Sequence, residues 1–137
     1  MVDDRLRSLL EEPTPAVLTT YRRDGSAATS PVWFRFKDDV FEVVVAAGDV
    51  KLKHLARRPA CALVVFEAVP PFRGIRVEAE PELVAGDVAE VRLAISSRYL
   101  GSERGRRFTD QRDPRGTVLR FPAAAASSWD LSAILPD

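Results

Sequence analysis

AVLTTYRRDGSAATSPVWFRF occupies residues 16–36 and decides how the fold begins. Residues 16–21 are rich in strand-forming side chains, and Asp24-Gly25 is a strong signal for a tight hairpin turn. Residues 27–36 then continue as a second strand. One face of this strand carries apolar residues at alternate positions, namely Val32, Phe34 and Phe36. The stretch therefore predicts an antiparallel β-hairpin near the start of the chain.

Pro31 interrupts the second strand of this hairpin. A proline has no backbone N–H and cannot donate a ladder hydrogen bond, so within sheets it is confined to edges and bulges. We therefore expect an edge or a bulge at Pro31, where the sheet opens.

The rest of the chain alternates strand and helix signals. Strands are predicted at residues 40–47, 60–66, 73–84, 117–121 and around 129–131, and helices at 1–12, 49–58 and 87–99. Residues 101–115 are predicted to form a mobile loop. The pattern indicates one domain, 1–137, with a barrel core over 16–84 and a closing strand within 116–131. The expected fold class is mostly β or α+β, with six short antiparallel strands closed into a barrel and peripheral helices.

Composition excludes several classes of protein. The 137 residues include 20 basic and 20 acidic side chains, which disfavours a nucleic-acid partner. No apolar run is long enough for a membrane span and the N-terminus is charged, so a cytoplasmic protein is expected. Cys61 and His54 are the only cysteine and histidine, which argues against a disulfide, a metal site and most nucleophilic triads. Cys61 itself is interpreted as a small buried hydrophobic residue.

If the chain is an enzyme, a bound cofactor should therefore supply its chemistry. The best anion-binding candidate is the start of the helix predicted at 49–58, where Lys51, Lys53 and His54 lie close to free backbone N–H groups. Residues two apart on an ideal helix point about 200° apart, so the two lysines cannot share one phosphate unless the first turn is irregular. A solvated lysine pair is the alternative interpretation.

The ordered motifs of the first half of the chain resemble those of one family. They are Ala16-Val17-Leu18-Thr19-Thr20, Arg23-Asp24-Gly25-Ser26, Ser30-Pro31-Val32-Trp33-Phe34 and Lys51-x-Lys53-His54-Leu55-x-x-Arg58-Pro59. This set resembles the pyridoxamine 5'-phosphate oxidase-like split-barrel superfamily, and within it the F420-dependent (deazaflavin) oxidoreductase branch. The resemblance implies a split-barrel homodimer with a cofactor at the interface touched by both subunits.

The resemblance also implies roles for particular residues. Lys51 and Lys53 match the positions that hold the cofactor phosphate, and His54 stands where relatives often have asparagine. The strand beside the cofactor ring is matched by Ser30, Pro31, Val32 and Trp33, and the strand end facing it by Val45, Ala46 and Ala47. Arg73 is expected to reach the neighbouring subunit's cofactor. No catalytic side chain and no metal ligand are implied.

Alternatives remain for several of these residues. Trp33 also suits an ordinary core or interface aromatic, and Arg73 also suits a surface arginine beside a proline turn. An Arg-x-Val-Leu stretch, which holds the FMN phosphate in the true oxidase, is absent from the second strand, so pyridoxamine phosphate oxidation is disfavoured. The arginine-rich segment 98–115 is interpreted as a solvated loop or as a contact for the acidic oligoglutamate tail of the deazaflavin.

The expected function is an F420-dependent reductase that transfers a hydride to an unsaturated small-molecule acceptor. The protein would contribute orientation and exclusion of water. The alternatives are an FMN-dependent oxidase or flavin reductase and a non-catalytic cofactor-binding protein. Haem binding ranks below these, because His54 is the only histidine available as a ligand.

Overall fold

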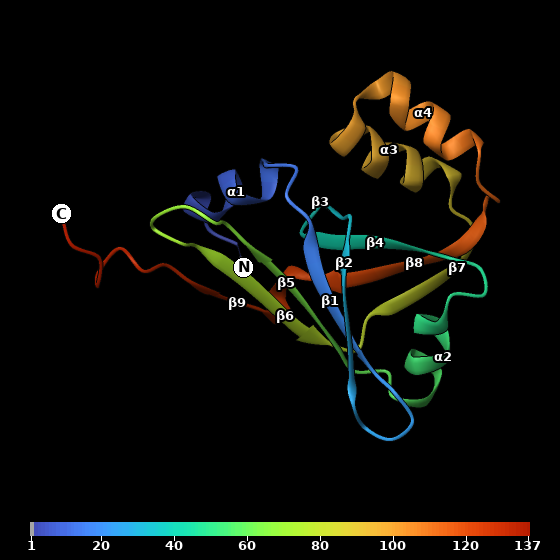
Figure 1. The fold of residues 1–137 in the computed structure, drawn as a ribbon, viewed down its shortest axis with the longest axis horizontal. Coiled ribbons are helices and arrows are strands. Elements are labelled where there is room, and N and C mark those ends of the chain that lie inside the picture. The colour runs from blue at the N-terminus through green and yellow to red at the C-terminus, as the bar shows by residue number, and fades with distance from the viewer. Residues whose placement is uncertain (1) are drawn as a thin grey trace.

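Two antiparallel sheets and four α-helices make up residues 2–137, the part of the chain that the computed structural model describes (Figure 1). The nine strands are β1 (Ala16–Tyr21), β2 (Ala27–Val32), β3 (Arg35–Lys37), β4 (Val40–Ala46), β5 (Cys61–Phe66), β6 (Gly74–Ala79), β7 (Glu82–Asp87), β8 (Arg115–Pro122) and β9 (Ala126–Trp129). The helices are α1 (Asp4–Glu11), α2 (Val50–Arg57), α3 (Ala89–Leu100) and α4 (Ser102–Asp110), and a 3₁₀ turn covers Ala123–Ala125. The mostly-β α+β class predicted from sequence is confirmed.

The strands are ordered β2-β1-β5-β6-β9 in one sheet and β3-β4-β8-β7 in the other. The expected number of six strands is wrong, because two predicted strands are each divided between the sheets and because β8 and β9 are separate strands in different sheets. The 27–36 strand leaves the first sheet after Val32 and resumes as β3 in the second. The 73–84 strand is broken before Glu82 at Pro81, which cannot donate a ladder hydrogen bond, and β7 then joins β8. The described residues thus form two separately hydrogen-bonded sheets rather than one closed six-stranded barrel.

The predicted hairpin is confirmed. β1 and β2 pair from Ala16 opposite Val32 to Tyr21 opposite Ala27. Gly25 adopts a φ of 89°, a conformation that disfavours side chains with a Cβ. Strand β2 is an edge strand, so Pro31 lies where the missing N–H interrupts no inner ladder.

The hydrophobic core contains side chains from both sheets. The largest fully buried ones are Phe34, Phe41, Phe121, Leu9, Leu18, Leu63, Ile75 and Leu119. Burying one such side chain contributes about 1.5–3 kcal/mol relative to leaving it in water. Helix α1 adds Leu6, Leu9 and Leu10 to the same core, as its amphipathic pattern predicts.

A buried ion-pair network crosses the second sheet. Glu42 is only 5% exposed and accepts hydrogen bonds from Arg35 Nε at 2.7 Å and from Arg120 Nη1 at 3.2 Å. The three residues lie side by side on β3, β4 and β8. This network fixes the register of the strands that carry the site described below.

The predicted loop at 101–115 is wrong, because residues Ser102–Asp110 form helix α4, packed against α3. Contact between the helices is close at Gly105, where an added Cβ would lie 2.7 Å from Ser97 Cα. Ser96 Oγ donates to Gly105 O at 3.1 Å and lies 3.2 Å from Thr109 Oγ1. The many polar residues of this segment resemble a loop in sequence, but small residues allow it to pack as a helix.

None of the helices in residues 2–137 is long and apolar enough to cross a membrane.

Candidate functional site

A cavity of about 390 Å³ opens where the end of β4, the start of α2 and the α3–α4 hairpin meet. Its lining comprises Val32, Trp33, Val44, Val45, Ala46, Ala47, Asp49, Lys51, Arg92, Ile95, Ser96, Phe108, Arg112, Asp113 and Arg115. The volume lies within the range of about 300–1,000 Å³ typical of small-molecule sites. Six of the eleven residues expected to bind the cofactor therefore line one cavity.

Trp33 lies at the point where the chain passes from β2 to β3. Its ring stacks on Tyr99 of α3, with centroids 5.0 Å apart and planes 11° apart, and contacts Phe108 of α4 at 5.1 Å. Tyr99 Oη in turn donates to Thr14 O and accepts from the Phe34 N–H. Trp33 thus lines the cavity and also attaches the helical hairpin to the sheets, so the two interpretations of this residue are both compatible with the structure.

The start of α2 forms a second wall of the cavity and contributes the cationic side chain of Lys51. Asp49 caps the helix, accepting from the Lys51 N–H at 2.8 Å, and its carboxylate lies 3.6 Å from Lys51 Nζ. A helix N-terminus carries partial positive charge and free N–H groups, which favour a bound anion. Lys51 is well placed for a phosphate in the cavity.

Lys53 and His54 do not line the cavity. α2 is a regular helix, so the expected divergence of Lys51 and Lys53 applies: Lys51 is partly buried at the cavity, whereas Lys53 is exposed. The His54 ring instead packs toward β1, with Nδ1 2.9 Å from Thr20 Oγ1. Within one subunit, only one of the three residues expected at the phosphate lies at the cavity.

Ser30 and Pro31 also lie outside the cavity lining, although their neighbours Val32 and Trp33 belong to it. They pair with Leu18 and Val17 along the edge strand β2. Their predicted proximity to a cofactor ring remains a prediction.

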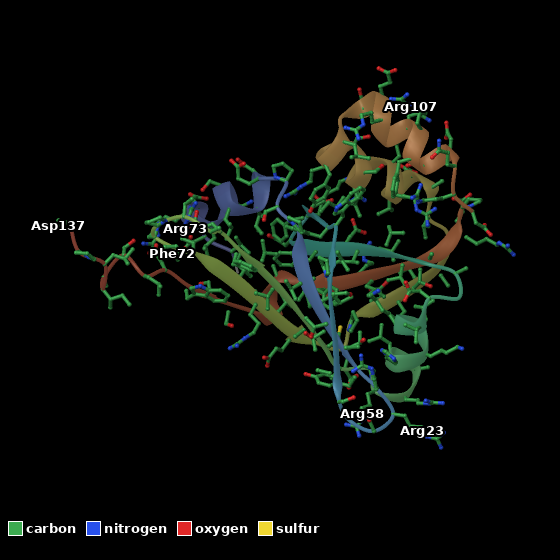
Figure 2. The ribbon with its side chains drawn as sticks, in the orientation of Figure 1. Arg23, Arg58, Phe72, Arg73, Arg107 and Asp137 are labelled. Carbon is green, nitrogen blue, oxygen red and sulfur yellow. The ribbon has the colours of Figure 1, made fainter. Side chains whose placement is uncertain are left out.

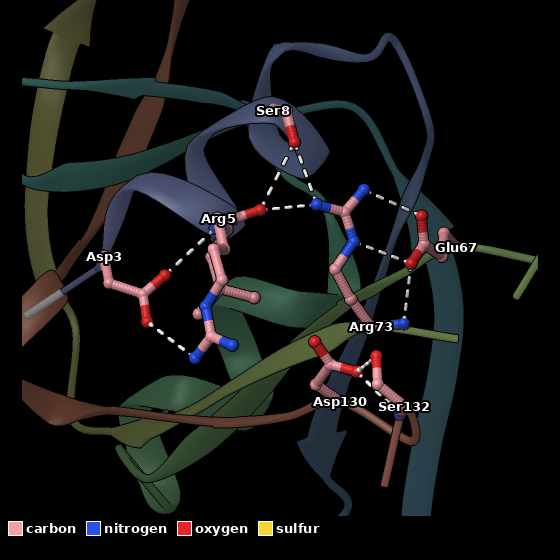
Figure 3. Close-up of polar contacts among 8 residues, drawn as sticks. Asp3, Arg5, Ser8, Glu67, Arg73, Asp130 and Ser132 are labelled. Atoms are coloured by element: carbon pink, nitrogen blue, oxygen red, sulfur yellow. Dashed lines mark hydrogen bonds and ion pairs between the residues drawn. The ribbon is translucent and has the colours of Figure 1, made fainter. Parts of the chain in front are cut away.

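Arg73 lies in a different part of the molecule, beside α1 and away from α2 and α4 (Figure 2). Its guanidinium forms a two-pronged ion pair with Glu67, with Nε and Nη2 2.8 and 2.9 Å from the carboxylate oxygens (Figure 3). It also donates to Arg5 O and Ser8 Oγ of α1. These contacts hold Arg73 in place within the subunit, and a contact with a partner's cofactor remains a prediction.

The α3–α4 hairpin and the segment after it bring three arginines to the cavity. Arg115 is paired with Asp113, with Nη2 2.7 Å from Oδ2, and this hydrogen bonding lowers the pKa of the Asp113 carboxyl to about 2. Arg92 is buried, and the pKa of its guanidinium is lowered. The larger cause is burial, and the second is the nearby charge of Arg112. These arginines make the hairpin side of the cavity strongly cationic.

Sequence reasoning missed most of this hairpin wall. The sequence does not distinguish Arg92 and Ser96 within the predicted helix, and Phe108 falls in the predicted loop. Arg112 and Arg115 belong to the arginine-rich segment that is interpreted as a solvated loop or as a contact for the deazaflavin tail. The available signal was the concentration of arginines between residues 98 and 115. Within residues 2–137, no three His, Cys, Asp or Glu side chains are grouped in a way that could hold a metal ion.

Comparison with solved structures places the fold among known proteins. A conserved hypothetical protein from Mycobacterium tuberculosis has a TM-score of 0.82 at 21% identity, covering 100% of this chain and 90% of its own. An F420 reductase has a TM-score of 0.73 at 23% identity, covering 92% and 98%. HutZ, the haem storage protein from Vibrio cholerae, has a TM-score of 0.68 at 13% identity, covering 91% and 92%.

No curated protein matches the sequence. A family model does, and it is described as pyridoxamine 5'-phosphate oxidase and spans residues 2–130. This match confirms the family to which the sequence motifs point. The chain belongs to the pyridoxamine 5'-phosphate oxidase family.

Proposed function

We propose that the protein is an F420-dependent reductase that binds the deazaflavin in the cavity between α2 and the α3–α4 hairpin. The observation that carries this proposal is the pairing of an apolar wall with a cationic helix N-terminus in one cavity of about 390 Å³. Family membership supports oxidoreductase chemistry, and the similarity to an F420 reductase favours the deazaflavin.

The cavity residues fit such a cofactor. Lys51 and the partial positive charge at the N-terminus of α2 suit its phosphate, since an anion is favoured at a helix N-terminus. Val45, Ala46 and Ala47 at the end of β4 offer small side chains against which a flat ring can lie. In its reduced form, a bound deazaflavin would supply a hydride for an electron-poor C=C or C=N bond.

The protein's own contribution to this reaction is orientation. Trp33 and Phe108 lie in contact and line one side of the cavity. Holding the acceptor and the cofactor in one geometry reduces the entropic cost of the reaction. No side chain need act as acid or base, because solvent can supply the proton.

A homodimer is part of the proposal. Every residue of β7 is exposed in the single subunit, and this edge strand carries Leu83 and Val84 outward. A second subunit that covers such residues would remove them from water. Light scattering of the purified protein should give twice the mass of the chain, and the mass of a single chain would contradict the dimer.

The test of cofactor binding is a fluorescence titration with F420 and, separately, with FMN. We expect micromolar binding of F420 and weaker binding of FMN. Lys51→Ala should lower the F420 affinity by about tenfold, the loss expected for a charge-assisted contact, because Lys51 lines the cavity. Lys53→Ala is the matched control on the same helix and should change it less than twofold. Equal losses in the two variants, or no F420 binding, would contradict the proposal.

FMN-dependent oxidation is the second candidate, favoured by the description of the matching family. Tighter binding of FMN than F420 in the same titration would select it. Haem binding has less support, because His54 Nδ1 contacts Thr20 and the ring does not line the cavity. A non-catalytic carrier would bind F420, but reduced F420 on the protein would stay reduced whichever acceptor was added.

A further inference from the structure

We propose that Arg92 and Arg112 form a carboxylate-binding site at the hairpin side of the cavity, and that the carboxylate belongs to the acceptor. This inference rests on the proposed function, because it assigns a substrate class, apolar molecules bearing a carboxylate, to the same cavity.

The cavity is lined by four cationic and two acidic side chains. Each acid is already engaged by one cation: Asp49 lies 3.6 Å from Lys51, and Asp113 forms a two-pronged pair with Arg115. In the part of the chain that the structure describes, neither Arg92 nor Arg112 forms an ion pair with an acidic side chain. Two arginines are left as counter-charges for a ligand.

Arg92 is the more informative of the two because it is 7% exposed. A charged group is rarely buried to this degree unless it is paired. The side-chain hydrogen bond that Arg92 makes runs from Nη1 to Asp113 O at 2.8 Å. Among residues 2–137, the edge formed by Nε and Nη2 has no hydrogen-bond partner, and its two parallel N–H groups match the two oxygens of a carboxylate.

This free edge is not fully enclosed by protein. Among residues 2–137, the single side-chain nitrogen or oxygen that is fully enclosed without a hydrogen-bond partner is Arg98 Nε. The remaining nitrogens of Arg92 are therefore not sealed inside the protein, and Arg92 lines the cavity.

Arg112 lies on the same side of the cavity and is held by Phe108. Its Cζ is 3.3 Å from the centre of the Phe108 ring, and its Nη1 donates to Phe108 O at 2.8 Å. Burial and then the charge of Arg112 lower the pKa of Arg92, whereas the charge of Asp113 raises it, so a further anion near both arginines would favour their charged forms. Apolar side chains of Trp33, Ile95 and Phe108 line the adjoining wall and suit the apolar body of the ligand.

The test compares trans-cinnamate with its neutral isostere trans-cinnamamide, each titrated into the F420-saturated protein and followed by the ¹⁵N–¹H signals of the arginine Nε groups. We expect cinnamate to bind and to move the Arg92 signal, and the amide to bind at least tenfold more weakly. Absence of cinnamate binding up to about 10 mM overturns the proposal, because a dissociation constant above about 10 mM is too weak for a specific site. Equal binding of the amide also overturns it.

Four variants assign the site. Arg112→Gln, Arg92→Gln and Arg92→Lys should each weaken cinnamate binding by about tenfold or more, the lysine variant because it lacks the paired N–H edge. Arg107→Gln is the control, because Arg107 is exposed on α4 and does not line the cavity. If the Arg92 variants fail to fold, Arg112→Gln decides. An equal loss in Arg107→Gln, or no loss in Arg112→Gln, overturns the assignment.

The same proteins separate the sources of the carboxylate. If Arg92→Lys or Arg112→Gln weakens F420 binding tenfold while cinnamate binding is unchanged, the carboxylate is the cofactor's own and the proposal is overturned. If inorganic phosphate competes as well as cinnamate does, the site is a general anion site, which also overturns it. If the wild-type protein binds cinnamate through Arg92 but does not bind F420, the proposed function fails and this site stands.

Discussion

Replacing Gly105 with alanine tests whether the α3–α4 packing shapes the cavity. The new Cβ would lie 2.5 Å from Ser97 Oγ and 2.7 Å from Ser97 Cα and N, and backbone atoms cannot rotate away. An ordinary contact begins near 3.4 Å, so α4 must move by about 0.7 Å. Overpacking of this kind costs about 1–3 kcal/mol. Alanine gains about 1 kcal/mol over glycine in helix propensity, which offsets part of that cost.

The movement should also weaken the hydrogen bond from Ser96 Oγ to the carbonyl of residue 105. With the three effects combined, we expect Gly105→Ala to lower the free energy of unfolding by about 1–2 kcal/mol. Because α4 carries Phe108, the movement should also weaken F420 binding several-fold. Urea unfolding and the fluorescence titration measure the two effects, with Arg106→Ala as a control at an exposed site on α4. A variant that is more stable than wild type and binds F420 normally would refute the reasoning.

Three further predictions follow from the charges and burial. Glu42→Gln removes the buried charge between two guanidinium groups and should cost about 3 kcal/mol in urea unfolding; a loss below 1 kcal/mol would contradict this. Burial raises the pKa of the Cys61 thiol to about 12, so a thiol reagent at pH 8 should label it only as fast as the protein unfolds, and rapid native-state labelling would count against it. Asp113, with its pKa lowered to about 2, contributes stability that is present above pH 4 and is lost as the pH falls through 2; Arg115→Gln should move its NMR titration back toward 3.8, and an unchanged pKa would exclude Arg115 as the cause.

The hairpin and the first helices could be predicted because their signals are local. Asp24-Gly25 specifies the turn at any position in a fold, and Pro31 specifies an edge strand by its missing N–H. The cap at Asp49 likewise depends on residues next to it in the chain. Such features depend on backbone chemistry within a few residues.

The hairpin wall of the cavity could not be predicted because it depends on distant contacts. α4 is helical through its fit to α3 at Gly105, and a single glycine among arginines looks like a loop in sequence. Arg92 occupies a buried position because it donates to Asp113 O, 21 residues away. Pro81 is a local signal for the break in the 73–84 strand, but the position of β7 in the second sheet depends on β8, which pairs with it from much later in the chain.

A crystal structure of the protein with bound F420 tests the central claim most directly. We expect the cofactor ring to lie against Val45–Ala47 at the end of β4, with its phosphate at Lys51 and the start of α2. Cofactor density elsewhere on the protein, with no cofactor in the cavity, would show that the proposed site is wrong.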